Sequence, residues 1–275
     1  MQPIPTYSRG NLLLSMKNIA LSYKGFPVLA GVNGDIFDLH EDGQTRGQVV
    51  GLLGPSGVGK TQLLKILSGM QRSEYTGEVL ISEKQLPIKR GQVGVVAQSY
   101  PLFEHRTLLG NMLVAVPAKD RANAHEVAMT MLRAYDLEKE WDKYPYQLSG
   151  GQRQRAATAQ QMLCSSHFLI MDEPFSGQDP VRVKNACKFI TDVASRDTLN
   201  TIVLVSQTIS PVVVVADMVW LLGRARAADG SIIPGAFIKK EINLIDRGLA
   251  WQPDVKRLPE FVETVREIEA EFDFL

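Results

Sequence analysis

Residues 54–61 read Gly-Pro-Ser-Gly-Val-Gly-Lys-Thr, a glycine-rich run that ends in a lysine and a threonine. Glycines at this spacing let backbone N–H groups turn toward an anion, because no side chain blocks the anion's approach. The lysine can reach the β- and γ-phosphates of a nucleotide, and the threonine hydroxyl can bind Mg²⁺. We therefore predict a nucleotide phosphate-binding loop made of Gly54, Pro55, Ser56, Gly57, Val58, Gly59, Lys60 and Thr61. On this motif alone, a glycine-rich turn before a helix is the alternative.

A second candidate site follows the apolar run 168–171, where two adjacent acids, Asp172 and Glu173, stand. A carboxylate at the end of a buried strand is unfavourable unless it is paired or bound to a cation. We interpret Asp172 as a magnesium ligand, direct or through water, and Glu173 as the group that polarises the attacking water. The alternative, that one acid only caps the next helix, is disfavoured by Pro174 and by the wholly apolar strand before it.

The elements around these residues are typical of an α/β fold. The continuous apolar run 49–53 predicts a buried parallel strand, and the phosphate loop then leads into a helix over 60–68 that ends at Gly69. The run 37–46 is polar and predicts a surface loop. Further strands are expected at residues 12–23, 28–37, 78–82, 93–97, 168–171 and 201–205.

Residues 101–161 have a helical character. One amphipathic stripe, expected to face the core, is formed by Ala124, Val127, Ala128, Met131, Leu132 and Tyr135. Beyond residue 223 we expect a turn region near 229–230 and 234–235, followed by a final helix with an acidic, solvent-facing side. The apolar face of this helix is expected to hold Leu258, Phe261, Val262, Val265 and Ile268.

Composition narrows the class of protein. The chain has 275 residues, with 30 basic and 30 acidic side chains and a formal net charge of +0, so no nucleic-acid partner is expected. Its two cysteines, Cys164 and Cys187, fit a reducing cytosol and no zinc site. No signal peptide is expected. The apolar stretch 202–222 is interrupted by polar residues, which favours two buried parallel strands with a short connection over a membrane span.

The run 148–152 reads Leu-Ser-Gly-Gly-Gln, and a hydroxyl and two glycines before a helix can bind an anion. Together with the phosphate loop and Asp172–Glu173, this run resembles the ATPase domain of the ATP-binding cassette (ABC) family over about residues 12–223. The resemblance implies a P-loop NTPase (RecA-like) core with N-terminal antiparallel β strands. The implied domains are an ABC ATPase domain, 1–223, with a helical subdomain inserted at about 99–161, and a C-terminal extension, 224–275.

The resemblance also implies roles for single residues. Tyr23 would stack on the adenine of ATP, although ordinary packing is an alternative for this tyrosine. Gln98 would contact Mg²⁺ and sense the helical subdomain, and Asp179 would couple two ATP sites. The signature residues Ser149, Gly150, Gly151 and Gln152 would close on the γ-phosphate of ATP held by a second copy or a related chain.

Gln207 is the largest departure from the family pattern, which places a histidine after the strand 202–206. The four histidines of this chain stand elsewhere, at His40, His105, His125 and His167. An amide side chain can donate a hydrogen bond to the γ-phosphate, but it stays neutral and cannot take a proton. We therefore expect the catalytic set Glu173, Gln207 and Gln98 to hydrolyse ATP slowly, with ATP binding unaffected.

Two functions compete for such an ATPase. The first is the ATPase subunit of a transporter, docked on separate transmembrane permease subunits at the cytoplasmic face of the cell membrane. The second is a soluble ABC ATPase that acts on a nucleic-acid, ribosomal or cluster-assembly partner. Two features favour the transporter: the chain has a single nucleotide-binding domain, and no long heptad insertion interrupts it. The segment 98–111 also resembles that of bacterial importer subunits, which favours the transporter and import over export.

Overall fold

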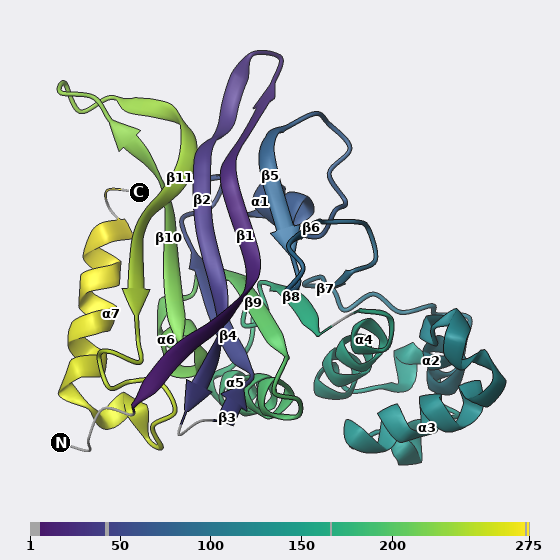
Figure 1. The fold of residues 1–275 in the computed structure, drawn as a ribbon. Helices are drawn as coiled ribbons and strands as arrows, with labels where there is room; N and C mark the ends of the chain where they lie inside the picture. Colours follow the sequence, from purple (N-terminus) through teal and green to yellow (C-terminus); the bar gives the residue numbers. More distant parts are fainter. Residues whose placement is uncertain (1–5, 42–43, 166, 273, 275) are drawn as a thin grey trace.

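The computed structural model describes residues 6–41, 44–165, 167–272 and 274. Within this part of the chain, one curled eleven-stranded sheet has the order β6-β5-β1-β2-β11-β10-β4-β9-β8-β7, with β3 paired to β2 (Figure 1). The mixed α/β architecture confirms the predicted fold class. None of the described helices is both long and apolar enough to cross a membrane.

The parallel half of the sheet carries the predicted buried strands. β4 (Gln48–Leu53) pairs in parallel with β9 (Thr201–Ser206), which pairs in parallel with β8 (Phe168–Asp172). β7 (Val93–Val96) continues this order beyond β8, and every residue of β4 and β9 is buried. Such strands carry continuous apolar runs because helices cover both faces of a parallel sheet.

The helices beside these strands follow them along the chain. α1 (Lys60–Leu67) follows β4 and stops before Gly69, whose φ of 66° lies in the left-handed region that ends helices. α5 (Pro180–Ser195) follows β8, and the short α6 (Ile209–Val215) connects β9 to β10 (Met218–Arg226). β9 and β10 both run parallel to β4, on its two sides, so the predicted pair of buried strands in the stretch 202–222 is confirmed.

The antiparallel half of the sheet contains the N-terminal strands. β1 (Tyr7–Tyr23) pairs with β2 (Phe26–Glu41) on one side and with β5 (Thr76–Ile81) on the other, and β6 (Leu86–Pro87) extends this edge. The predicted surface loop over 37–46 is wrong. β2 continues to Glu41, and β3 (Gln44–Arg46) pairs back onto it; residues 42–43 lie outside the described residues. Leu39 and Asp38 are buried, so a polar run here does not face solvent throughout.

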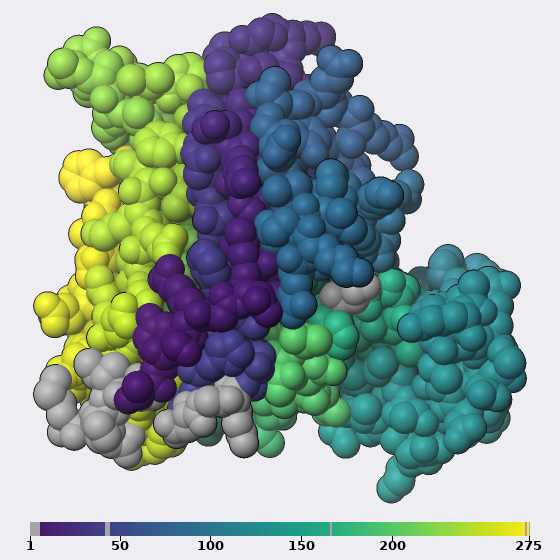
Figure 2. Space-filling model, viewed as in Figure 1, coloured from purple at the N-terminus to yellow at the C-terminus, as the bar shows by residue number. Residues whose placement is uncertain are grey.

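The helical part forms a lobe beside the parallel half of the sheet (Figures 1 and 2). It holds α2 (Leu108–Ala115), α3 (Ala124–Ala134), α4 (Gly150–Cys164) and three short 3₁₀ turns at Ala118–Asn123, Glu138–Glu140 and Pro145–Gln147. The predicted stripe on α3 is confirmed: Ala128, Leu132 and Tyr135 are buried, and the other members pack partly buried against the same apolar cluster.

The C-terminal segment is woven into the fold. β11 (Ile232–Asn243) pairs antiparallel with β10 and also in parallel with β2, so it joins the two halves of the sheet. The turn predicted at 234–235 is wrong, because these residues lie within β11. A bend remains there, since Gly235 has a φ of 98° and an added Cβ would meet Ala30 at 2.6 Å.

α7 (Pro259–Phe272) packs Phe261 and Ile268 into the core, next to α6, and a 3₁₀ turn at Val255–Arg257 precedes it. One expectation for this helix is wrong: Val262 is 42% exposed, whereas Thr264 is buried. On the acidic side, Glu263 and Glu269 are exposed as expected, while two other acids form ion pairs at the surface: Glu267 with Arg247 and Lys240, and Glu271 with Lys240.

A buried carboxylate joins this segment to the start of β4. Asp217 lies just before β10; its Oδ2 accepts a hydrogen bond from Val49 N at 2.6 Å, and its Oδ1 accepts one from Trp251 Nε1 at 2.6 Å. Burial raises the pKa of Asp217 to about 7, although both hydrogen bonds and the charge of Arg46 lower it. Since the unfolded group titrates near 3.8, the folded chain binds the extra proton between about pH 4 and 7, and this group makes stability fall as pH rises through that window.

We predict that Asp217→Asn flattens this pH dependence. Asparagine does not titrate, and its amide offers one acceptor where the ionised carboxylate offers two to the converging donors, so the variant should lose about 1–3 kcal/mol of unfolding free energy at pH 8. Urea unfolding at pH 5.5 and pH 8 measures both effects, with Asp192→Asn, an exposed carboxyl on α5, as the control. A variant that keeps the wild-type pH slope would contradict the assignment.

Candidate functional site

The phosphate loop lies between the end of β4 and the start of α1, at the carboxyl edge of the parallel strands (Figure 1). Gly57 and Gly59 have φ values of 75° and 122°, so two of its glycines occupy conformations that other residues adopt with strain. An added Cβ at Gly57 would meet nothing within 4 Å, which leaves that side of the loop open. The strand, loop and helix are the context that the motif requires.

Lys60 turns back into this loop. Its Nζ donates hydrogen bonds to Gly54 O at 2.7 Å and Pro55 O at 3.1 Å, and it lies 3.9 Å from Glu173 Oε1. Burial lowers the pKa of Lys60, while the charges of Glu173 and then Asp172 raise it. The ammonium group therefore stands between the loop carbonyls and the two acids that sequence reasoning selected.

The two acids come from the end of β8. Burial raises the pKa of Asp172, and only the charge of Lys60 opposes this. Glu173 has a φ of 47°, and its Oε2 accepts hydrogen bonds from Ser206 Oγ at 3.1 Å and from Gln207 N at 3.3 Å. The structure thus places Lys60, at the start of α1, near Asp172, Glu173 and Gln207, which stand at the ends of β8 and β9. Ser206, which also contacts Glu173, was not selected from the sequence. Its only signal was its place at the end of an apolar strand.

The residues present fit a magnesium nucleotide. Asp172 is a carboxylate whose ionised form is disfavoured by burial, and a divalent cation would reverse that effect. Thr61 and Ser56 are exposed at the loop, where a hydroxyl can reach a cation or a phosphate. Hard oxygen donors of this kind suit Mg²⁺ together with phosphate oxygens.

Tyr23 ends β1 and lies against α1. Its hydroxyl donates to Gln62 Oε1 at 2.9 Å and accepts from Gln71 Nε2 at 3.1 Å, and the residue stays 39% exposed. The aromatic ring is thus held beside the helix that leaves the phosphate loop, with part of its surface free.

The signature residues begin α4 in the helical lobe. Ser149 caps this helix, since its Oγ accepts from Gln152 N at 3.3 Å while Gln152 Oε1 accepts from Ser149 N at 2.9 Å. The Gln152 amide also donates to Glu140 Oε1 at 3.0 Å, which commits this side chain within its own lobe.

A cavity of about 620 Å³ separates the lobe from α5. Gln98, Ser149, Gly150 and Gly151 line it together with Gln178, but no residue of the loop 54–61 does. Asp179 caps α5 nearby by accepting from Val181 N and Arg182 N, each at 3.0 Å. Gln98 and the signature therefore line one cavity, which the phosphate loop of the same chain does not line.

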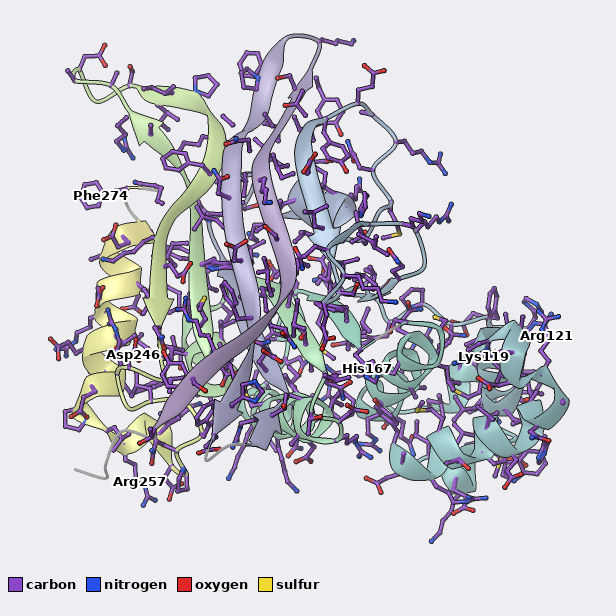
Figure 3. All side chains as sticks on the ribbon, in the orientation of Figure 1. Lys119, Arg121, His167, Asp246, Arg257 and Phe274 are labelled. Carbon is purple, nitrogen blue, oxygen red and sulfur yellow. The ribbon has the colours of Figure 1, made fainter. Side chains whose placement is uncertain are left out.

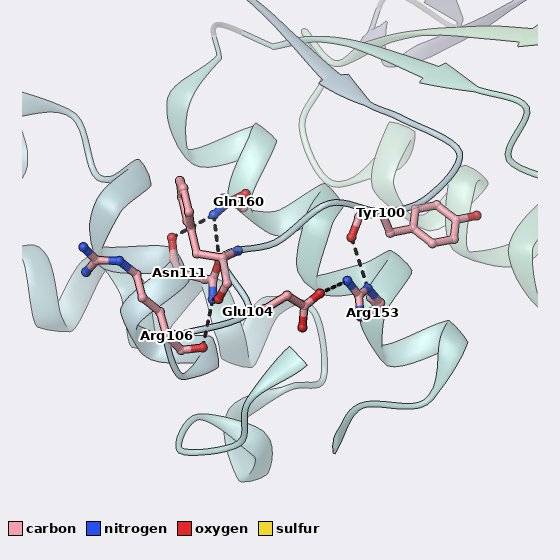
Figure 4. A network of polar contacts seen from close by, with 7 residues as sticks. Tyr100, Glu104, Arg106, Asn111, Arg153 and Gln160 are labelled. Atoms are coloured by element: carbon pink, nitrogen blue, oxygen red, sulfur yellow. Dashed lines mark hydrogen bonds and ion pairs between the residues drawn. The ribbon is translucent and has the colours of Figure 1, made fainter. Parts of the chain in front are cut away.

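A polar network ties the segment after Gln98 to the helical lobe (Figure 4). Asn111, fully buried, accepts from Phe103 N at 2.7 Å and donates to Arg106 O at 3.2 Å, while Gln160 Nε2 donates to Asn111 O at 3.0 Å. Arg153, next to the signature, donates to Tyr100 O at 3.3 Å and pairs with Glu104. Sequence reasoning missed these residues because single polar side chains in a helical region look like a solvated face.

Gln207 directly follows β9, and its side chain is exposed. His167 stands before the first residue of β8, at the other end of this strand from Glu173 (Figure 3). The ring nitrogen of His167 lies 3.7 Å from Asp197. This histidine therefore cannot act in place of Gln207.

The geometry defines a nucleotide-binding α/β protein with a helical insertion, and comparison with known proteins identifies its family. The family model described as "ABC transporter" matches residues 44–176. The chain is 32% identical over 233 residues to the probable amino-acid import ATP-binding protein YxeO of Bacillus subtilis, a match that covers 80% of this chain and 88% of the relative. It is 33% identical over 218 residues to the sulfate/thiosulfate import ATP-binding protein CysA 2 of Rhizobium meliloti, covering 76% and 57%.

Among solved structures, cbiO1 from Clostridium perfringens, part of the ABC transporter complex cbiONQ, matches with a TM-score of 0.68. That match covers 94% of this chain and 100% of the other at 22% identity, so it supports the fold. The chain belongs to the ATP-binding proteins of ABC transporters, and it is an ATPase subunit that powers transport.

We predict that Ser206→Ala slows ATP hydrolysis by about tenfold while the KM for ATP stays within about twofold. The variant removes one hydrogen bond to the Glu173 carboxylate, and hydrogen bonds to charged groups are the stronger ones. Steady-state phosphate release measures this, with Ser195→Ala, at the far end of α5, as the control. An unchanged kcat would show that Ser206 does not orient Glu173.

Proposed function

We propose that this chain binds Mg-ATP between Tyr23, the loop 54–61 and Asp172, and that Glu173 activates the water that attacks the γ-phosphate. The observation that carries this proposal is the convergence of Lys60, at the start of α1, and Glu173, just after β8, whose charged atoms lie 3.9 Å apart. A cation and a carboxylate held there serve phosphate binding and water activation, respectively.

Each residue then has a separate task. The loop amides and Lys60 bind the phosphates, Thr61, Asp172 and Gln98 hold Mg²⁺, and Glu173 accepts the proton of the attacking water. Mg²⁺, when bound, neutralises charge on the phosphate oxygens. Ser206 and the backbone of Gln207 keep the Glu173 carboxylate directed, since both donate to its Oε2. The tyrosine ring of Tyr23 supplies an apolar surface for the base.

The proposed task of this ATPase is the import of a small polar solute. The relatives named above are an amino-acid import protein and a sulfate/thiosulfate import protein, which supports import and an amino acid or small anion as cargo. Selection of the solute would rest with separate permease subunits, on which the chain would sit peripherally at the cytoplasmic face of the membrane. The soluble ABC ATPase is not favoured by these relatives.

The Gln207 amide is proposed to stand where a charged donor would accelerate hydrolysis. A neutral hydrogen bond is about half as strong as a charge-assisted one, so we predict slow turnover with ordinary ATP affinity. Gln207→His should raise kcat and introduce a pH dependence near 6.5, and Gln207→Ala should lower what remains. Phosphate release across pH 5.5–8 measures both. If Gln207→Ala hydrolyses ATP as fast as the unmodified chain, another group stabilises the γ-phosphate.

The signature is proposed to close on ATP held by a second copy or a related chain. The cavity that the signature lines contains no residue of the loop 54–61 of the same chain, which supports this arrangement. Gly151 is exposed, and an added Cβ would meet nothing within 4 Å, so Gly151→Asp places a carboxylate toward a partner without a clash in its own chain.

We predict that Glu173→Gln, which binds ATP without turnover, dimerises in ATP, whereas Glu173→Gln with Gly151→Asp stays monomeric at the same ATP affinity. Sedimentation with and without ATP measures this. Gly151→Asn, of equal size but neutral, is the control and should retain most of the dimer. Equal dimerisation of the Asp and parent variants would rule out closure at the signature.

The segment 101–111 is proposed to face the permease. Phe103 is 44% exposed there, next to His105 and Arg106, while the polar network fixes its backbone to α2 and α4. We predict that Phe103→Asp shifts the chain from the membrane fraction to the soluble fraction of cells that express it. Val262→Asp, with similar exposure on α7, should stay with membranes. Phe103→Asp that co-purifies with membranes like the parent would contradict this docking surface.

A further inference from the structure

A residue far along the chain holds the outer side of the phosphate loop. Arg224 Nη2 donates a hydrogen bond to Gly57 O at 2.7 Å, across a sequence separation of 167 residues. On the inner side, Lys60 binds the carbonyls of Gly54 and Pro55. Two cations thus bind three carbonyl oxygens of this loop, one from a buried lysine and one from a partly exposed arginine.

The sheet explains how Arg224 reaches the loop. β10 runs parallel to β4, with Leu221 opposite Leu53, and it continues past the end of β4 to Arg226. Arg224 follows three residues later and is itself paired with Ala236 of β11, which fixes its backbone. An added Cβ at Gly54 would meet Leu222 O at 2.6 Å, so β10 packs closely against the start of the loop.

The contact determines how one peptide group is turned. In a trans peptide, the carbonyl of one residue and the N–H of the next point in opposite directions. Because Gly57 O points outward to Arg224, Val58 N–H points into the loop, where it makes only a long, 3.4 Å hydrogen bond to Pro55 O. A donor with such a weak partner is available for a phosphate oxygen. Gly57 has a φ of 75° and no Cβ, so without this contact the peptide has other orientations open to it.

We propose that Arg224 is a positioning residue for nucleotide binding: it fixes the Gly57–Val58 peptide so that the Val58 amide faces the phosphates. This inference rests on the proposed role of the loop 54–61. Arg224 lies outside the glycine-rich motif, the two acids and the signature. Since loop amides of this kind surround the α- and β-phosphates, the effect concerns ADP as well as ATP.

The test compares Arg224→Gln, Arg224→Lys, Arg226→Gln and Lys60→Ala by fluorescence titration with ATP and with ADP, in Mg²⁺, at low and high salt. Arg226 is the matched control, because it lies on the same strand but donates to Gly230 O at the hairpin turn. Lys60→Ala tests the loop itself and should abolish tight binding.

We expect Arg224→Gln to weaken ATP and ADP binding alike, on the order of tenfold, the lower range for one hydrogen bond to a charged group. The ratio should persist at high salt, where long-range attraction is screened. Arg224→Lys should be intermediate, Arg226→Gln should match the parent, and in Arg224→Gln the KM should rise with kcat unchanged.

Three results would overturn the inference. Parent-like binding by Arg224→Gln, while Lys60→Ala has lost binding, would remove Arg224 from the site and leave the phosphate loop intact. A loss confined to ATP would mean that Arg224 contacts the γ-phosphate directly. A loss that vanishes at high salt would mean that only its charge matters. Normal binding by Lys60→Ala would instead refute the proposed nucleotide site.

Discussion

The site depends on the burial of three adjacent parallel strands whose ends carry charge. β4, β8 and β9 pair residue by residue through the core, so their carboxyl ends lie at one edge in fixed register. Asp172, Glu173 and Ser206 stand at that edge, at the ends of β8 and β9, where strand pairing fixes their positions, and Lys60 begins α1 beside them. Burial lowers the pKa of Lys60 and raises that of Asp172, so burial disfavours the charged form of both groups. An opposite charge nearby, on the other side chain or on a bound ligand, favours the charged forms again.

Much of this arrangement could be predicted from short runs of sequence. Continuous apolar runs identify buried parallel strands, and a glycine-rich loop between such a strand and a helix identifies a phosphate site. The carboxyl ends of parallel strands meet at one edge, which explains why Glu173, after β8, and Gln207, after β9, lie at the same end of the sheet. The stripe on α3 followed from helical spacing, because a packed face needs apolar side chains at that period.

The errors arose where tertiary contacts override local composition. The run 37–46 is polar, yet strand pairing satisfies its backbone and Leu39 enters the core. Pro234 and Gly235 are typical of turns, but the neighbouring strand accommodates the bend within β11. Arg153 and Arg224 act through hydrogen bonds to backbone carbonyls distant in sequence, and a single sequence contains no signal for such a contact.

The position of β11 has a consequence for the order in which the chain can fold during synthesis. Within the described residues, the hairpin of β1 and β2 reaches the parallel strands through β11, the last strand in the sheet, which pairs with β2 on one side and β10 on the other. The hairpin that carries Tyr23 emerges from the ribosome first, but its neighbour in the sheet is made last. Because contacts of such sequence separation form slowly, the nascent protein presents an open strand edge until translation has passed Asn243.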